Sequence, residues 1–143
     1  MYNNSVAKGQ IEKLMKQWAD ELAKKDLEAI AKHYADESIV FDVMDHANGP
    51  QEYKKLWEDC LPYFDNIEIE YKDMQIHAEE NMAFVFFLSR LKGFKETQNT
   101  DMAKSWLRGT VCYRKIKGQW KTVHEHISFP VNCITEKIEY LLD

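Results

Sequence analysis

Residues 119–130, with the sequence QWKTVHEHISFP, carry most of what the chain reveals about its fold and its site. The segment reads as an extended strand, and side chains along a strand point alternately to its two faces. One face is expected to hold Trp120, Thr122, His124, His126 and Ser128. Hydroxyls and imidazoles are costly against a core, because each buried polar group needs a hydrogen-bond partner. The segment therefore predicts a strand whose histidines line a pocket.

The composition is typical of one globular domain spanning residues 1–143, with 45% hydrophobic and 30% charged residues. A net charge of -5 disfavours nucleic acid and anionic membranes as partners. The cysteines, Cys60, Cys112 and Cys133, are odd in number and widely spaced, which indicates reduced thiols. The first ten residues lack the apolar core of a signal peptide, and no run approaches the roughly 20 apolar residues of a membrane span. We expect a cytoplasmic protein.

Helical patterns dominate the first part of the chain. Apolar residues recur at helical spacing over residues 5–25, and Asp26 is placed to cap a second short helix. The β-branched and aromatic residues of 38–43 predict a short strand ending at Asp42. Pro50 then suits the first turn of a third helix, which Pro62 ends.

The second half of the chain predicts long strands at residues 67–77, 82–93, 102–115 and 119–129. Residues 135–142 have apolar residues at helical spacing, so a short terminal helix is expected there. Helices followed by strands favour an α+β fold in which a curved antiparallel sheet wraps around three N-terminal helices as a cone-shaped half-barrel. The open end of such a cone is where a ligand is expected to bind.

The order ααβαββββ, together with DLEAIAKHYADESIVFD (residues 26–42) and RGTVCYRKIKGQWKTVHEHIS (residues 108–128), resembles the nuclear transport factor 2-like superfamily. The resemblance is to its SnoaL-like and ketosteroid isomerase-like branch and covers nearly the whole chain. It implies a cone-shaped, cystatin-like fold. It leaves function open, because this scaffold hosts isomerases, cyclases, dehydratases, hydrolases and binding or assembly domains.

The resemblance assigns a role to one acid. In ketosteroid isomerases the last Asp of the pattern matched by YADESIVFD is the general base, and that position is Asp42. A carboxylate in a dry cone can move a proton next to a carbonyl if desolvation raises its pKa. The isomerase's helical Tyr and late-strand Asp donors correspond approximately to Trp18 and Thr110, so steroid isomerisation is not expected.

The remaining site candidates come from the last two strands and the helices. If the turn at residues 117–118 extends to a three-residue loop with Gln119, then Arg108, Thr110 and Cys112 stand beside Ser128, His126 and His124. Arg108 and the two histidines would then share a wall and donate hydrogen bonds to a ligand while Asp42 takes a proton. A two-residue loop breaks this grouping. Four aromatic residues are further candidates to bind a planar ligand: Trp18, Tyr53, Trp57 and Trp106.

Each candidate also has a structural interpretation. The aromatic residues fill space in most cores, strand histidines are often structural, and Asp42 can cap the loop that follows it. His-x-His is also a metal-ligand spacing, with Asp42, Asp45 or His46 as a third ligand, but two ligands define no site and we expect neither metal nor cofactor.

Three functions remain open: cofactor-free acid–base chemistry on a small hydrophobic carbonyl compound, ligand binding without turnover, and assembly. A homodimer is expected through an apolar outer sheet face, predicted to hold Val111, Tyr113, Val123 and Ile127.

Overall fold

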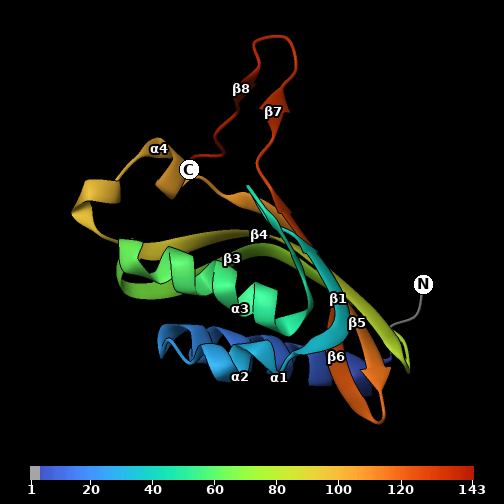
Figure 1. Cartoon of the computed structure of the whole chain (residues 1–143). Coiled ribbons are helices and arrows are strands. Elements are labelled where there is room, and N and C mark those ends of the chain that lie inside the picture. The colour runs from blue at the N-terminus through green and yellow to red at the C-terminus, as the bar shows by residue number, and fades with distance from the viewer. Residues whose placement is uncertain (1–3) are drawn as a thin grey trace.

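A computed structural model describes residues 4–143 and shows the predicted α+β architecture (Figure 1). The helices are α1 (Ser5–Ala23), α2 (Leu27–Ala31), α3 (Gly49–Cys60) and α4 (Asp101–Lys104), with short 3-10 turns η1 (Leu61–Tyr63) and η2 (Glu96–Gln98). The strands are β1 (Tyr34–Phe41), β2 (His46–Asn48), β3 (Phe64–Ala78), β4 (Met82–Phe94), β5 (Leu107–Ile116), β6 (Gln119–Ser128), β7 (Val131–Asn132) and β8 (Lys137–Ile138).

Side-chain caps fix where the first two helices begin. The Asn4 side chain accepts a hydrogen bond from the Ala7 amide at 3.0 Å, and Asp26 accepts one from Ala29 at 3.1 Å. The predicted buried stripe of the first helix is formed, with Ile11, Met15 and Leu22 in the core.

The main sheet has six strands in the order β2-β1-β6-β5-β4-β3. Neighbouring strands are antiparallel except for β1 and β6, which run parallel, so the first and last long strands of the cone are joined side by side. The sheet curves around helices α1 to α3, and the β7–β8 hairpin projects beyond it (Figure 1). The predicted cone with its curved sheet is confirmed, with this one parallel pair as a difference.

Three predicted elements differ from the structure. The strand expected at 38–43 is longer and lies at Tyr34–Phe41, and residues 101–104 form α4 because the Thr100 side chain caps them. The helix predicted over 135–142 is wrong, since this region forms the β7–β8 hairpin. Its turn is held by the Asn132 side chain, which accepts hydrogen bonds from the Ile134 and Thr135 amides.

The β5–β6 hairpin decides which side chains face the interior. Its turn has two residues, Lys117 and Gly118, both with positive φ (51° and 78°), as a tight hairpin turn requires. Near the turn Lys115 pairs with Trp120, but farther along Thr110 pairs with His126, so β6 holds one extra residue. That residue is Val123, which forms a β-bulge and reverses the alternation of side chains after it.

The two-residue turn and the bulge together correct the predicted outer face. Val111 and Tyr113 are buried in a core cluster with α1, and Ile127 packs against the same cluster. A second cluster joins α1, α2 and α3 to β1 and β3, around Leu22, Ile30 and Ile67. Three of the four residues predicted for the outer face, Val111, Tyr113 and Ile127, therefore belong to the interior, and Val123 is the bulge residue itself. Among residues 4–143, no helix is long and apolar enough to span a bilayer.

Candidate active site

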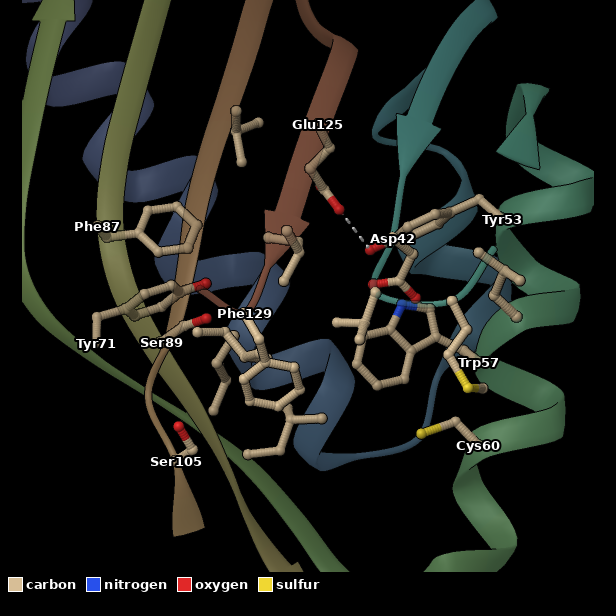
Figure 2. Close-up of a pocket in the computed structure, with 18 of the residues that line it drawn as sticks. Asp42, Tyr53, Trp57, Cys60, Tyr71, Phe87, Ser89, Ser105, Glu125 and Phe129 are labelled. Atoms are coloured by element: carbon tan, nitrogen blue, oxygen red, sulfur yellow. Dashed lines mark hydrogen bonds between the residues drawn. The ribbon is translucent and has the colours of Figure 1, made fainter. Parts of the chain in front are cut away.

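A cavity of about 570 Å³ lies between the inner face of the sheet and α1 and α3. Its size is within the range typical of small-molecule sites, about 300–1,000 Å³. Most of its lining is apolar, and Figure 2 shows Phe87 and Phe129 across from Trp57 on α3. Loop residues between β4 and β5 and residues near the β7–β8 hairpin complete the lining.

The buried acid of this cavity is Glu125, which is 8% exposed and comes from the part of β6 beyond the bulge. The Tyr34 hydroxyl donates to Glu125 Oε1 at 2.6 Å, and the Tyr53 hydroxyl donates to Oε2 at 3.3 Å. Burial raises the pKa of Glu125 to about 7, and the negative charge of Asp42 contributes to the rise, while the two tyrosine hydrogen bonds oppose it. Glu125 can therefore both donate and accept a proton near neutral pH.

The two tyrosines that hold Glu125 support each other. Their rings stack with centroids 4.0 Å apart, Tyr34 at the start of β1 and Tyr53 on α3. Burial and the nearby Glu125 carboxyl raise the pKa of both phenols well above the ordinary value, so both remain hydrogen-bond donors. A hydrogen bond with Trp57 acts in the opposite direction on the pKa of Tyr53. The acid is thus fixed in position by two neutral donors.

Asp42 follows the end of β1 and reaches the cavity from its rim. The residue itself is exposed, yet surrounding protein partly desolvates its carboxyl, and this burial raises its pKa. The backbone hydrogen bond of Val43 opposes the rise, and the charge of Asp45 adds to it. The Asp42 amide also donates to the Asp45 carbonyl at 2.8 Å, so Asp42 is part of a tight turn as well as of the cavity wall. Figure 2 shows its carboxyl beside Tyr53, on the same side of the cavity as Glu125.

No lysine, arginine or histidine is among the cavity-lining residues of the described chain. The charged groups facing the ligand space are therefore carboxyls alone, and the other polar groups are hydroxyls, a thiol, an amide and indoles. Such a cavity repels anionic ligands and accommodates uncharged ones.

The two histidines predicted to line the pocket lie on the other face of β6. His124 Nδ1 donates to the Ile39 carbonyl at 2.7 Å, and both imidazoles contact the Phe41 ring edge-on, at 5.2 and 5.7 Å between centroids. The predicted wall of Asp42 with His124 and His126 is wrong, because the bulge at Val123 turns the histidines outward. Within residues 4–143, no group of three or more His, Cys, Asp or Glu is placed to hold a metal ion.

Arg108 and Thr110 pair with Ser128 and His126, as the predicted grouping requires, but through a two-residue turn plus a bulge. The whole group lies outside the cavity, and Arg108 is exposed, with its guanidinium 3.5 Å from the Phe129 carbonyl. These two residues do not bind a ligand in this cavity.

Trp106 is buried away from the cavity, between Lys72 and Arg90, whose cationic groups lie 4.8 and 4.3 Å from its ring. Its indole nitrogen donates to the Asp143 carboxylate at 2.7 Å. Trp106 therefore anchors the C-terminal segment and does not contact a ligand.

The predicted aromatic positions Trp18, Tyr53 and Trp57 do line the cavity. Trp18 and Trp57 meet edge to face with centroids 6.0 Å apart. These rings pack in the core and also form the cavity wall, where they offer flat apolar surfaces to a cyclic molecule.

Sequence reasoning missed Glu125 and Tyr34. Glu125 stands in the row with Val123 and Ile127, which strict alternation assigned to the outer face. The available signal was the apolar character of that row, since an apolar row more often faces the core. An acid within such a row is a candidate buried acid.

The curved six-stranded sheet packed on three helices is the fold of the nuclear transport factor 2-like class of proteins. A solved structure of a protein of this class and of unknown function from Pseudomonas putida KT2440 is 26% identical, with a TM-score of 0.85 and coverage of 99% of each chain. Another from Novosphingobium aromaticivorans, described as having a cystatin-like fold, is 12% identical, with a TM-score of 0.73 over 91% of this chain and 86% of that one.

A proposed scytalone dehydratase from Novosphingobium aromaticivorans shares the fold at 21% identity, with a TM-score of 0.72 over 87% of this chain and 84% of that one. A comparison with curated proteins found no match. The model of the SnoaL-like domain family matches residues 11–132. The chain therefore belongs to the SnoaL-like domain family.

Proposed function

We propose that this protein is a cofactor-independent isomerase or dehydratase that moves protons on an uncharged, hydrophobic, carbonyl-bearing small molecule. The observation that carries the proposal is the buried Glu125, hydrogen-bonded by Tyr34 and Tyr53, in the same cavity as Asp42. Glu125, with a pKa of about 7, suits proton transfer near neutral pH, and burial raises the pKa of the Asp42 carboxyl as well. The apolar lining suits a hydrophobic substrate.

In the proposed reaction the Asp42 carboxylate removes a proton from the carbon next to the carbonyl. Protonated Glu125 donates a hydrogen bond to the carbonyl oxygen, on which negative charge develops. If Asp42 returns the proton to a different carbon, the result is an isomerisation. In a dehydration, the C–O bond breaks, Glu125 gives its proton to the leaving hydroxyl, and water departs. The proton on Asp42 then passes to the Glu125 carboxylate and resets the site.

The test uses cyclic ketones in deuterated water, with exchange at the carbon next to the carbonyl followed by NMR. Asp42→Asn should slow the enzymatic exchange by about 100-fold or more, because the amide cannot accept the proton. The matched control is Asp45→Asn, which removes a carboxylate from the same turn and should change the rate by less than about threefold. Equal rates in the wild type and Asp42→Asn would remove Asp42 from the mechanism. Tight binding without any exchange would favour the alternative of a ligand-binding protein without turnover.

We also propose a homodimer, now through the even-numbered side of β5 and β6. Exposed aromatic and aliphatic groups lie there, with Phe84 38%, Phe86 37%, Phe41 46% and Ile39 42% exposed. Cross-strand pairing aligns them with imidazoles in two rows that we call the outer rows: His77, Phe84, Cys112, His124 and Ile39, and Gln75, Phe86, Thr110, His126 and Phe41. Neither row contains an acid, lysine or arginine, so two copies can meet face to face without burying such charges.

Sedimentation at micromolar concentration should give a dimer for the wild type. The double variant Phe84→Lys, Phe86→Lys should give a monomer with an intact cavity, because four like charges would meet in the interface. A monomeric wild type would overturn the dimer and leave the enzymatic proposal unaffected.

A further inference from the structure

A second set of polar groups faces the cavity from β3 and β4. Tyr71 and Ser89 are direct cross-strand partners, and both line the cavity. Figure 2 shows their hydroxyls close together on the wall opposite Asp42. Ser89 is 4% exposed, and the Tyr71 ring is fixed edge-on against Phe87 at 4.9 Å. The pair is thus a rigid feature of the sheet.

Neither hydroxyl has a hydrogen-bond partner within residues 4–143, although tyrosine hydroxyls at the acid end are both bonded to Glu125. Both Tyr71 and Ser89 lie on the surface of the ligand space, so a bound molecule can satisfy them. Burial raises the pKa of Tyr71, so its phenol stays protonated and able to donate.

We propose that Tyr71 and Ser89 form a second polar subsite, which hydrogen-bonds an oxygen at the end of the substrate remote from Asp42. The substrate class is then an uncharged cyclic molecule with an oxygen function at each end. Apolar rings between the two ends, with Phe87 and Phe129 across from Trp57, hold the carbon skeleton. The position of the reacting end of the substrate rests on the proposed function. The position of the other end rests on the unpartnered hydroxyls of Tyr71 and Ser89.

The test compares two probes, tetralone and a hydroxytetralone with its hydroxyl on the ring remote from the carbonyl. Binding is measured by quenching of tryptophan fluorescence, since Trp57 lines the cavity. The hydroxytetralone should bind the wild type about 3- to 10-fold more tightly, the expected gain from a neutral hydrogen bond. The ratio should fall to about one in Tyr71→Phe, Ser89→Ala and the double variant, which preserve ring and backbone packing.

Cys60→Ala is the matched control, because it alters the opposite wall on α3 and should leave the ratio unchanged. A ratio near one in the wild type would mean that water alone satisfies these hydroxyls, and the subsite would be overturned. A wild-type ratio that persists in the double variant would overturn it too. The ratio is independent of turnover: if it collapses as expected while no proton exchange occurs in any variant, the subsite stands and the enzymatic proposal fails.

Discussion

The two faces of strand β6 carry opposite kinds of chemistry. On the inner face Glu125 is held by two tyrosine hydroxyls inside a mostly apolar cavity, where burial brings its pKa to about 7. On the outer face His124 and His126, its immediate neighbours, contact Phe41 at the surface of the sheet. Residue type alone would favour the imidazoles for acid–base chemistry. The comparison shows that location decides: a buried carboxyl has acquired the pKa usually associated with histidine.

The largest expected difference between the faces is in catalysis. Glu125→Gln should lower the exchange rate of a cyclic ketone by about 100-fold, because the glutamine amide is a much weaker acid than the carboxyl and stabilises the negative charge developing on the carbonyl oxygen less well. His124→Gln and His126→Gln, on the same strand, should each change the rate by less than about threefold. Rates are measured at neutral pH on variants whose thermal unfolding is cooperative. A large loss in either histidine variant, with Glu125→Gln active, would reverse the comparison.

The second prediction concerns stability and pH. Glu125 has a pKa of about 7 in the folded chain against an ordinary value of 4.5, so the folded state holds this proton more tightly. The resulting stability is complete below pH 4.5 and is lost as the pH rises to about 7. The loss amounts to about 3 kcal/mol, at about 1.4 kcal/mol per pKa unit.

Urea unfolding at about pH 5 and about pH 8 checks this prediction. The wild type should lose about 3 kcal/mol more than Glu125→Gln across this interval, because glutamine does not titrate. Thr110→Val, on the outer face and without a titratable group, serves as the control and should follow the wild type. Parallel behaviour of the wild type and Glu125→Gln would show that Glu125 is not buried as described.

A third prediction compares neighbouring residues of β5. At Gly109, on the inner face, an added Cβ would lie 2.4 Å from Phe87 Cε1 and 2.9 Å from Ile127 Cδ1. Gly109→Ala should therefore cost about 1–3 kcal/mol through overpacking. Thr110→Val, on the outer face, should change the free energy of unfolding by about 0.5 kcal/mol or less. Urea unfolding of both variants measures the difference, and equal costs would mean that the interior tolerates the extra methyl group.

The smallest expected effect lies within the outer face. The edge-on contact between Phe41 and His126, at 5.7 Å between ring centroids, is solvent-exposed in a single chain and should contribute about 0.5 kcal/mol in a monomer. A double-mutant cycle with Phe41→Leu and His126→Ala isolates this coupling energy. A coupling above about 1.5 kcal/mol would indicate that the outer rows are buried, as a tight dimer would make them.

Periodicity and caps predicted much of the fold. The apolar spacing around Ile11 and Leu22 indicated α1, and Pro50 and Pro62 placed α3 correctly. The resemblance to a known family supplied the curved sheet, and it placed Asp42 at the cavity. The hairpin at residues 131–138 was missed because its turn depends on side-chain hydrogen bonds of Asn132, which apolar spacing does not register.

The face of the last strand could not be predicted, because a single inserted residue reverses it. Val123 is an ordinary strand residue, and its bulge is visible only in the pairing of β6 with β5. Alternation holds from Trp120 to Thr122 and is then inverted at Glu125. Because the predicted alternation was off by one position beyond the bulge, it placed the surface histidines in the cavity and Glu125 on the outer face.

The parallel pairing of β1 with β6 has a consequence for biogenesis. Ile39 of β1 pairs with His124 of β6, and a hydrogen bond joins them across a separation of 85 residues. The sheet is therefore completed only after its last long strand has been synthesised. Contacts between distant segments slow folding, and the exposed edge of β1 is prone to aggregation until its partner arrives. Asp42 follows β1 and Glu125 lies on β6, so the pairing of these two strands brings both acids to the same cavity. Their juxtaposition should therefore be among the last events on the folding pathway. A nascent chain ending before residue 119 should have neither the complete six-stranded sheet nor a cavity that holds both Asp42 and Glu125.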